Sequence, residues 1–327
     1  MEQKTEKQQE EVKILSMDRI QSQTVKWLWY PYIPLGKITI VQGDPGEGKT
    51  TFVLNLTAML LQGKHFGDNQ QTEIPLFIIY QTAEDGLADT VKPKLEEAGA
   101  DCSKVLVIND SEKSLMMDDE RLERALNQTG TKVLILEPIQ AYLGQGVDMN
   151  RANEARDMTK KLGQIAERTG CAIILIGHMN KAGGSKAAYR GIGSIEFFAV
   201  ARSVLLVARV ADKPNIRVVA QIENNLAEEG SPIAFERCSD EFRWIGEYDI
   251  TVDELLCGYC KANKLQQAKQ YVKGLYGTET DIASKEIEQK AKTMGISKRT
   301  LDMVKQELNI TSKKIGDSWY WDFRQKP

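Results

Sequence analysis

Short runs of consecutive apolar residues recur through the first two thirds of the chain. They stand at residues 37–42, 76–81, 105–109, 133–137 and 172–177. Runs this short and this apolar are typical of strands buried on both faces of a parallel sheet. The segments between them read as helices, at residues 50–62, 86–98, 119–128 and 150–169. The alternation predicts an α/β domain in which helices flank a mainly parallel sheet.

The pattern changes after the glycine-rich segment 182–193. Three further segments, 203–210, 215–223 and 232–237, are apolar throughout or alternate between apolar and polar residues. Short breaks separate them. They predict later strands, some of them antiparallel.

The last 77 residues form a separate unit by pattern and by charge. Residues 251–327 hold 14 basic and 10 acidic residues, a net charge of +4, whereas the whole chain carries -3. Their pattern predicts a helix, then a helix–turn–helix with Gly295 at the turn and Ser297 as the N-cap of the second helix, then a hairpin. We therefore expect a disordered tail at 1–20, a large α/β domain at 21–248 and a small domain at 249–327.

The small domain has the features of a winged helix–turn–helix that binds DNA. Basic side chains on the second helix of such a unit face phosphates or base edges. The predicted DNA contacts are Lys298, Arg299, Lys305, Lys313 and Lys314. A small helical module that binds another protein remains the alternative, because the charge excess is modest for a nucleic-acid domain.

Composition is that of an ordinary soluble globular protein, with 42% hydrophobic and 27% charged residues. No apolar run reaches the roughly 18 residues that span a bilayer. The N-terminal segment MEQKTEKQQEE lacks the apolar region of a signal peptide. We expect a cytoplasmic protein with no membrane association.

The stretch GDPGEGKT at 43–50 follows one predicted strand and opens a predicted helix. It fits the P-loop pattern G-x-x-x-x-G-K-[ST], in which backbone amides hold phosphates at the positive end of a helix. The lysine of this pattern reaches the β- and γ-phosphates, and its last hydroxyl binds Mg²⁺. The residues expected to contact ATP are Gly43, Asp44, Pro45, Gly46, Glu47, Gly48, Lys49, Thr50 and Thr51.

Other polar residues follow the predicted strands. Glu137 ends one strand, where an acid that orients Mg²⁺ belongs, with a solvent-facing charge as the alternative. Glu84 follows another strand and is the candidate for polarising the attacking water, while Asp85 beside it is a candidate helix cap. His178 also stands at a strand end, as a sensor of the γ-phosphate or an ordinary polar group.

Two arginines follow the glycine-rich segment. Arg190 and Arg202 are candidates for an arginine finger that reaches a phosphate across a subunit boundary. For each arginine taken alone, a surface ion pair is the more common role.

The order of these motifs resembles one family. GDPGEGKT, LFIIYQTAEDG, VLILEPIQAYLG, GHMNKAGGSKAAYRG and FFAVARSVLLVAR resemble the RecA-like AAA-family ATPases of the RepA type, which include hexameric plasmid replicative helicases. The resemblance covers roughly residues 25–245. It implies a RecA-like core in a homo-oligomeric, hexameric ring with ATP at the subunit interfaces. It also implies that Lys49 and Thr50 are the Walker A pair, Glu84 the catalytic glutamate, His178 the sensor, and Arg202 or Arg190 the interfacial arginine.

Two positions depart from this family. It usually has aspartate where this chain has Glu137, and often lysine near Glu223. If that lysine touches phosphate in the neighbouring subunit, an acid there weakens hydrolysis, so the hypothesis is a slow ATPase. The C-terminal segment also resembles the winged helix of mobile-element relatives.

The sequence therefore predicts an ATP- and Mg²⁺-dependent ATPase that associates with DNA, as a replicative helicase or translocating ring. The alternative is an ATP-gated DNA-binding regulator that does not unwind DNA. A signalling ATPase without DNA is a third, weaker hypothesis.

Overall fold

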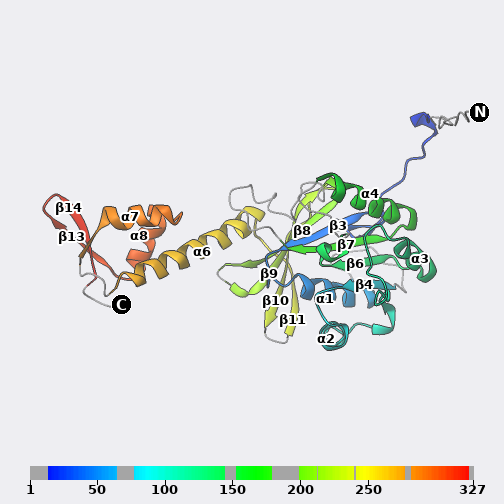
Figure 1. Cartoon of the computed structure of the whole chain (residues 1–327), viewed down its shortest axis with the longest axis horizontal. Coiled ribbons are helices and arrows are strands. Elements are labelled where there is room, and N and C mark those ends of the chain that lie inside the picture. The colour runs from blue at the N-terminus through cyan, green and yellow to red at the C-terminus, as the bar shows by residue number, and fades with distance from the viewer. Residues whose placement is uncertain are drawn as a thin grey trace, which may run out of the picture.

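The computed structural model describes residues 14–64, 77–143, 152–178, 199–211, 213–238, 241–276 and 281–323. Within them, a large sheet has the strand order β11-β10-β9-β8-β3-β7-β6-β4-β5 (Figure 1). Its strands are β3 (Ile38–Gly43), β4 (Ile78–Thr82), β5 (Val105–Leu106), β6 (Val133–Glu137), β7 (Ala172–His178), β8 (Ser203–Val210), β9 (Lys213–Asn224), β10 (Ile233–Cys238) and β11 (Glu241–Glu247). A small antiparallel ribbon, β1 (Trp27–Trp29) and β2 (Ile33–Pro34), precedes them.

The strands from β8 to β5 in this order pair in parallel, and β9, β10 and β11 add an antiparallel extension. The predicted α/β class with a mainly parallel sheet and later antiparallel strands is confirmed. The ribbon was not predicted. The strand expected at 105–109 is reduced to β5, because Ile108 instead exchanges hydrogen bonds with the side chain of Gln81.

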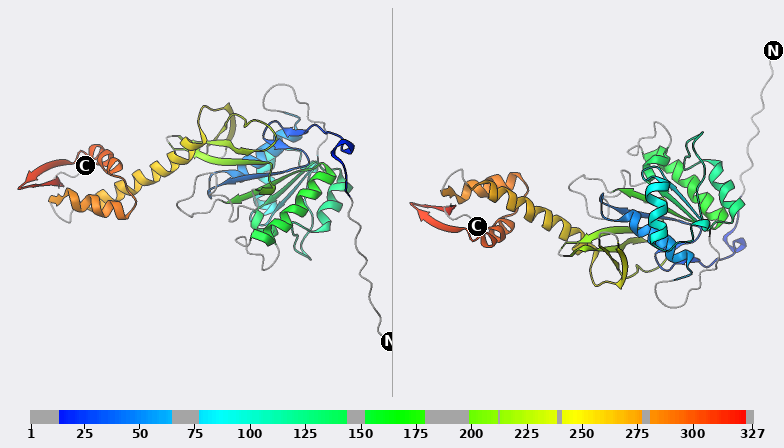
Figure 2. Two further views of the ribbon diagram at one scale, coloured as in Figure 1. Left: turned by 90° about the horizontal axis from the view of Figure 1, so that it is seen from above. Right: turned by 90° about the horizontal axis from the view of Figure 1, so that it is seen from below.

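Helices lie on both faces of the sheet (Figures 1 and 2). One buried cluster joins the sheet to α1 (Lys49–Leu61) and α2 (Lys92–Glu97). A second cluster joins the opposite face to α3 (Glu120–Thr129) and α4 (Ala152–Thr169). Strands covered on both faces explain the continuous apolar runs in the sequence.

The helix expected at 86–98 differs from the prediction. It begins as a π-helical turn, Leu87–Val91, before α2 starts at Lys92. Pro93 lies in the first turn of α2. Because proline has no amide hydrogen, it cannot continue the series of α-helical backbone hydrogen bonds from the preceding turn.

The C-terminal residues form a second core. Their elements are α6 (Val252–Gly274), β12 (Asp281–Ala283), α7 (Ser284–Thr293), α8 (Lys298–Glu307), β13 (Thr311–Ile315) and β14 (Ser318–Asp322). A buried cluster that includes Val272, Leu301 and Trp321 holds them together. The first turn of α6 packs on β9 and β10 through Leu255, and the helix then carries the unit away from the sheet (Figure 1).

The predicted turn between α7 and α8 is confirmed. Gly295 has a φ of 68°, which favours glycine. The hydroxyl of Ser297 accepts a hydrogen bond from the Thr300 amide at 3.2 Å, as an N-cap does. Among the described residues, none of the helices has the length and apolarity that crossing a membrane requires.

Candidate functional site

Four strand ends meet at one edge of the sheet. The register pairs Gly43 at the end of β3 with His178 at the end of β7, and Thr82 at the end of β4 with Glu137 at the end of β6. The Ala83 amide also donates to the Glu137 carbonyl oxygen at 2.9 Å. The edge formed by carboxyl ends of parallel strands is where α/β folds bind ligands. It gathers the residues that the sequence placed on separate strands.

The turn between β3 and α1 requires its glycines. A Cβ on Gly43 would lie under 3.0 Å from the carbonyl oxygen of Val207 on the neighbouring strand β8. Gly46 and Gly48 have φ angles of 81° and 92°, which side chains with a Cβ rarely adopt. The Glu47 amide donates to the Asp44 carbonyl at 3.3 Å and closes the turn. The backbone thus takes the P-loop form that the sequence predicts.

Lys49 lies under this turn. Its ammonium donates to the carbonyl oxygens of Gly43 at 2.9 Å and Asp44 at 3.0 Å, and to Nδ1 of His178 at 3.2 Å. The residue is only 5% exposed. Burial lowers the pKa of this amine, and nearby carboxylates, of which Glu137 has the largest effect, oppose the shift.

His178 links Lys49 to Glu84. Its Nε2 lies 3.4 Å from Oε1 of Glu84, whose side chain is 50% exposed. An ammonium only donates hydrogen bonds, so Nδ1 accepts from Lys49, and Nε2 carries the hydrogen that points at Glu84. The imidazole therefore joins the P-loop lysine to the candidate catalytic acid.

Thr50 and Glu137 form the candidate magnesium site. The Thr50 hydroxyl donates to Oε1 of Glu137 at 2.5 Å. Hydroxyl and carboxylate oxygens are the hard donors that Mg²⁺ binds, so this pair fits the ion. No group of three or more His, Cys, Asp or Glu side chains in the described part of the chain could hold a metal, so phosphate and water oxygens would complete the shell.

Tyr80 is a site residue that the sequence analysis missed. Its hydroxyl donates to Oε2 of Glu137, and the ring is fully buried. Burial raises the pKa of the Glu137 carboxyl, while the hydrogen bonds from Thr50 and Tyr80 oppose the shift. In the sequence Tyr80 stands inside an apolar run, so its pattern indicates a core residue. The signal that could have identified it as a site residue is its hydroxyl, which needs a hydrogen-bond partner when it is buried.

Asp85 does not cap a helix. Its carboxylate lies 3.5 Å from the ammonium of Lys94, and its amide donates to the Thr82 hydroxyl at 3.2 Å. The acid next to Glu84 is therefore turned toward α2, whereas Glu84 faces His178.

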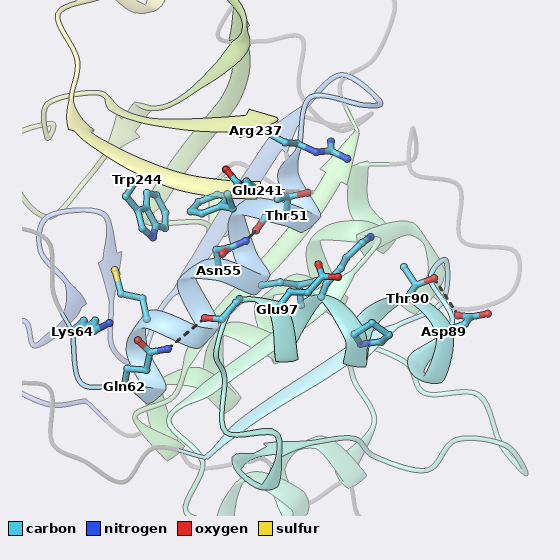
Figure 3. A pocket seen from close by; sticks show the side chains of 16 residues that line it. Thr51, Asn55, Gln62, Lys64, Asp89, Thr90, Glu97, Arg237, Glu241 and Trp244 are labelled. Atoms are coloured by element: carbon cyan, nitrogen blue, oxygen red, sulfur yellow. Dashed lines mark hydrogen bonds between the residues drawn. The ribbon is translucent and has the colours of Figure 1, made fainter. Parts of the chain in front are cut away.

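A cavity of about 620 Å³ extends from the P-loop side of α1 (Figure 3). It is bounded by α1, the segment from Asp89 to Ala98, and the β10–β11 hairpin. Thr51, Arg237 and Glu241 line one part of it, and Gln62 and Lys64 line another. Trp244 and Phe242 add aromatic surface to its wall.

The candidate arginine finger lies elsewhere. Arg202 precedes β8, and the next residue, Ser203, pairs with Thr39 near the start of β3, so exposed Arg202 is at the opposite edge from the P-loop of its own chain. Glu223 pairs with Val204 and lies at that same far edge. Contact of either with a neighbouring subunit's nucleotide stays a prediction. Arg190 lies outside the described residues.

Three of the five predicted DNA contacts bind other parts of the chain. Lys298 pairs with Glu288 at 2.9 Å, and Lys313 with Asp281 at 2.6 Å. The Lys305 ammonium donates to the Ser312 hydroxyl and lies 5.0 Å from the centre of the Trp321 ring. Sequence alone did not reveal these partners, because they come from β12, α7 and the hairpin. Arg299 and Lys314 are exposed.

Comparison with known proteins gives a family match, curated relatives and similar solved structures. A family model described as an AAA domain matches residues 5–184, more than half of the chain. DNA repair protein RadA of Halalkalibacterium halodurans is 26% identical over 168 residues, which cover 50% of this chain and 33% of RadA. RadA of Bacillus subtilis is 22% identical over 150 residues, covering 45% of this chain and 29% of RadA. The chain thus spans about a third of the length of these curated relatives.

Among solved structures, a DnaB-like replicative helicase, described with its interactions with primase, aligns with a TM-score of 0.50. The alignment covers 64% of this chain and 57% of that one at 12% identity. At this identity the likeness concerns the fold, which is that of RecA-like P-loop NTPases.

Proposed function

The chain belongs to the AAA domain family, and from this premise we propose that it binds and hydrolyses ATP in association with DNA. One observation carries the proposal: a continuous set of contacts joins Lys49 through His178 to Glu84, beside the Thr50–Glu137 pair. It supplies a phosphate ligand, a metal site and an acid at one edge of the sheet, which phosphoryl transfer to water requires.

The P-loop amides and Lys49 bind the phosphates of ATP. Mg²⁺, when bound at Thr50 and Glu137, neutralises charge on the β- and γ-phosphates. Burial lowers the pKa of Lys49, and the surrounding carboxylates oppose this shift and favour the positive form that binds phosphate. The residues Gly43 to Thr51 provide the remaining contacts.

Glu84 polarises the attacking water. Half of its side chain is exposed, so water reaches it, and His178 fixes its position relative to Lys49. A γ-phosphate bound by Lys49 competes for the hydrogen bond between Lys49 and His178. Phosphate binding therefore changes the contact between His178 and Glu84. General-base assistance of this kind contributes roughly a hundredfold to ten-thousandfold in rate.

The sugar and base of ATP occupy the cavity that begins at Thr51. Its volume of about 620 Å³ suits a nucleoside, and the aromatic wall at Phe242 and Trp244 suits a planar base. The cavity adjoins the P-loop through Thr51, next to the metal-binding Thr50.

Association with DNA rests on the relatives and on the C-terminal unit. RadA is named as a DNA repair protein and the aligned solved structure as a replicative helicase. The helix–turn–helix and hairpin of residues 249–327 have the element order of a winged helix, which binds duplex DNA through its second helix. We propose a RepA-type ATPase that forms a hexameric ring and unwinds or translocates along DNA.

An ATP-gated DNA-binding regulator is the second candidate. The observation that favours it is the Glu137 carboxylate held by both Thr50 and Tyr80, which restrains the acid that must bind the metal. In this alternative, nucleotide binding sets assembly and the C-terminal unit reads a DNA site.

ATP hydrolysis by the full-length protein, with and without single-stranded DNA, tests the proposal. The wild type should hydrolyse ATP faster with DNA, and Glu84→Gln should lose at least about a hundredfold in kcat while it still binds ATP. Asp85→Asn is the matched control, since Asp85 faces Lys94, and its kcat should stay near wild type. Equal rates for wild type and Glu84→Gln would remove Glu84 from the reaction.

Unwinding of a forked duplex separates the two candidates. Strand release with ATP by the wild type, and not by Lys49→Ala, supports a helicase. Binding to a specific duplex site without strand release supports the regulator.

A further inference from the structure

Three arginines lie beside the P-loop, and the proposed reaction gives them no role. Arg209 on β8 lies directly opposite Arg217 on β9, which in turn lies opposite Phe235 on β10. Arg237 is two residues beyond Phe235 and shares its face of β10, since side chains alternate along a strand. Leu206 of β8 pairs with Gln42, just before the P-loop, so Arg209 lies three residues further toward the phosphate-binding edge.

These arginines adjoin residues of the P-loop itself. Nη2 of Arg209 lies 3.7 Å from Oε1 of Glu47. A Cβ built on Gly48 would lie 3.9 Å from Cγ of Arg217. Arg237 is exposed and lines the same cavity as Thr51, and Figure 3 shows both toward one end of that view. One row of guanidinium groups therefore runs from the P-loop to the cavity.

Among the described residues, the row has more positive charge than its neighbours neutralise. Glu47 is 4% exposed and Arg217 is 6% exposed. Oε2 of Glu47 and Nε of both Arg209 and Arg217 have no hydrogen-bond partner among the described residues. Nη1 of Arg217 donates a hydrogen bond to the Pro214 carbonyl oxygen. Like charges opposite one another on neighbouring strands destabilise a sheet, and buried charges need partners.

The other acids that the structure describes nearby form no ion pair with these three arginines. Glu236 pairs with Arg243 at 2.5 Å, away from the row, and Glu241 lines the cavity near Arg237. Burial lowers the pKa of Arg217, and Arg209 and Arg237 lower it further against the opposing effect of Glu47. An anion at this place would satisfy donors that the described residues leave unpaired.

We propose that Arg209, Arg217 and Arg237 form an anion site that binds the phosphate chain of the nucleoside triphosphate held by the P-loop. The inference rests on the proposed function. Arg237, at the cavity, contacts the nucleotide, and Glu47, 3.7 Å from Arg209, is an acid that partly neutralises the site and opposes a bound anion. Guanidinium groups suit phosphate oxygens because they donate two parallel hydrogen bonds. Glu47 and Gly48 belong to the P-loop, so nucleotide phosphate is the nearest anion, ahead of a DNA phosphate.

Titration of the full-length protein with a fluorescent ATP analogue, and competition by ATP and inorganic tripolyphosphate, tests this site. Arg237→Gln should weaken ATP and tripolyphosphate binding by about tenfold to a hundredfold, the range for removal of a charge-assisted bond. Arg217→Gln should act in the same direction. Arg243→Gln on β11 is the matched control and should bind like wild type, because Arg243 pairs with Glu236.

Glu47→Gln distinguishes an anion site from a structural cluster. It removes one negative charge at constant size, so triphosphate binding should tighten, the opposite sign to the arginine variants. Arg237→Gln should unfold at the wild-type temperature, because Arg237 is exposed.

The outcomes separate the two proposals. A wild type that binds no nucleotide overturns the proposed function. A wild type that binds ATP, with unchanged affinity in Arg237→Gln and Arg217→Gln, overturns the anion site and leaves the function standing. Loss of DNA affinity with unchanged ATP affinity assigns the arginines to a DNA phosphate and also overturns the inference.

Discussion

His178 joins the two halves of the candidate site. A lone histidine at a strand end was equally consistent with an ordinary polar group, yet it lies between Lys49 and Glu84, at 3.2 Å and 3.4 Å. Its ring accepts on one side and donates on the other, so loss of either property breaks the connection.

His178→Ala should therefore lower kcat for ATP hydrolysis more than it lowers the affinity for ATP. Lys49 keeps its contacts to the Gly43 and Asp44 carbonyls, so ATP affinity should change little. Glu84 loses its partner, so kcat should fall by about tenfold or more. Single-turnover hydrolysis beside equilibrium ATP binding measures both, and an equal loss in the two would assign His178 to binding alone.

Glu137 makes metal binding sensitive to acid. Burial raises the pKa of its carboxyl, so it takes up a proton at a higher pH than an ordinary glutamate. Mg²⁺ needs the ionised form, so the Mg²⁺-dependent part of ATP affinity should fall as the pH drops through this raised pKa. Because this pKa is raised in the folded state, Glu137 adds to the free energy of unfolding at low pH. That contribution is lost as the pH rises through the folded pKa.

ATP titrations with Mg²⁺ and with EDTA between about pH 5 and pH 8 measure this dependence. The loss on acidification should appear with Mg²⁺ and should be absent in Glu137→Gln. A pH dependence that persists in Glu137→Gln would assign the titration to another group.

At the scale of elements, the junction of β3 and α1 depends on close contact with β8. Gly43 leaves no room for a Cβ, because the Val207 carbonyl occupies that position. Gly43→Ala should lower the free energy of unfolding by about 1–3 kcal/mol, since backbone must move, and should weaken ATP binding as well. Gly274→Ala, at the end of α6 with open space around it, should be neutral or slightly stabilising in urea denaturation. Similar stability for both variants would contradict the crowding.

At the scale of the whole molecule, the C-terminal unit has its own core and extends from the sheet on α6 (Figure 1). We expect DNA binding to depend on its exposed cations. The double variant Arg299→Ala with Lys314→Ala should weaken DNA binding. The slope of the logarithm of the binding constant against the logarithm of the salt concentration should also fall, by about one for each phosphate contact that is lost. Lys305→Ala should instead lower the unfolding temperature, since Lys305 contacts Ser312 and Trp321. Fluorescence anisotropy with labelled DNA at several salt concentrations measures the first effect, and wild-type affinity in the double variant would exclude this surface.

The sequence by itself determined the parts that depend on neighbours along the chain. Apolar runs marked the buried strands, the glycine spacing at 43–50 marked the turn, and Ser297 marked the start of a helix. Backbone conformation and caps are local properties, so their residue types can be read directly. Even the candidate acids Glu84 and Glu137 were found this way, because a position at a strand end is local information.

Only the tertiary structure decided which side chains meet. The strand order places β7 and β6 between β3 and β4, which brings His178 and Glu137 between the P-loop and Glu84. It also moved Arg202 to the far edge and put Arg209 and Arg217 beside Glu47. Strand order and register follow from the packing of the whole core, so the partners of Tyr80, Lys305 and Arg209 had no signal in any single stretch of sequence.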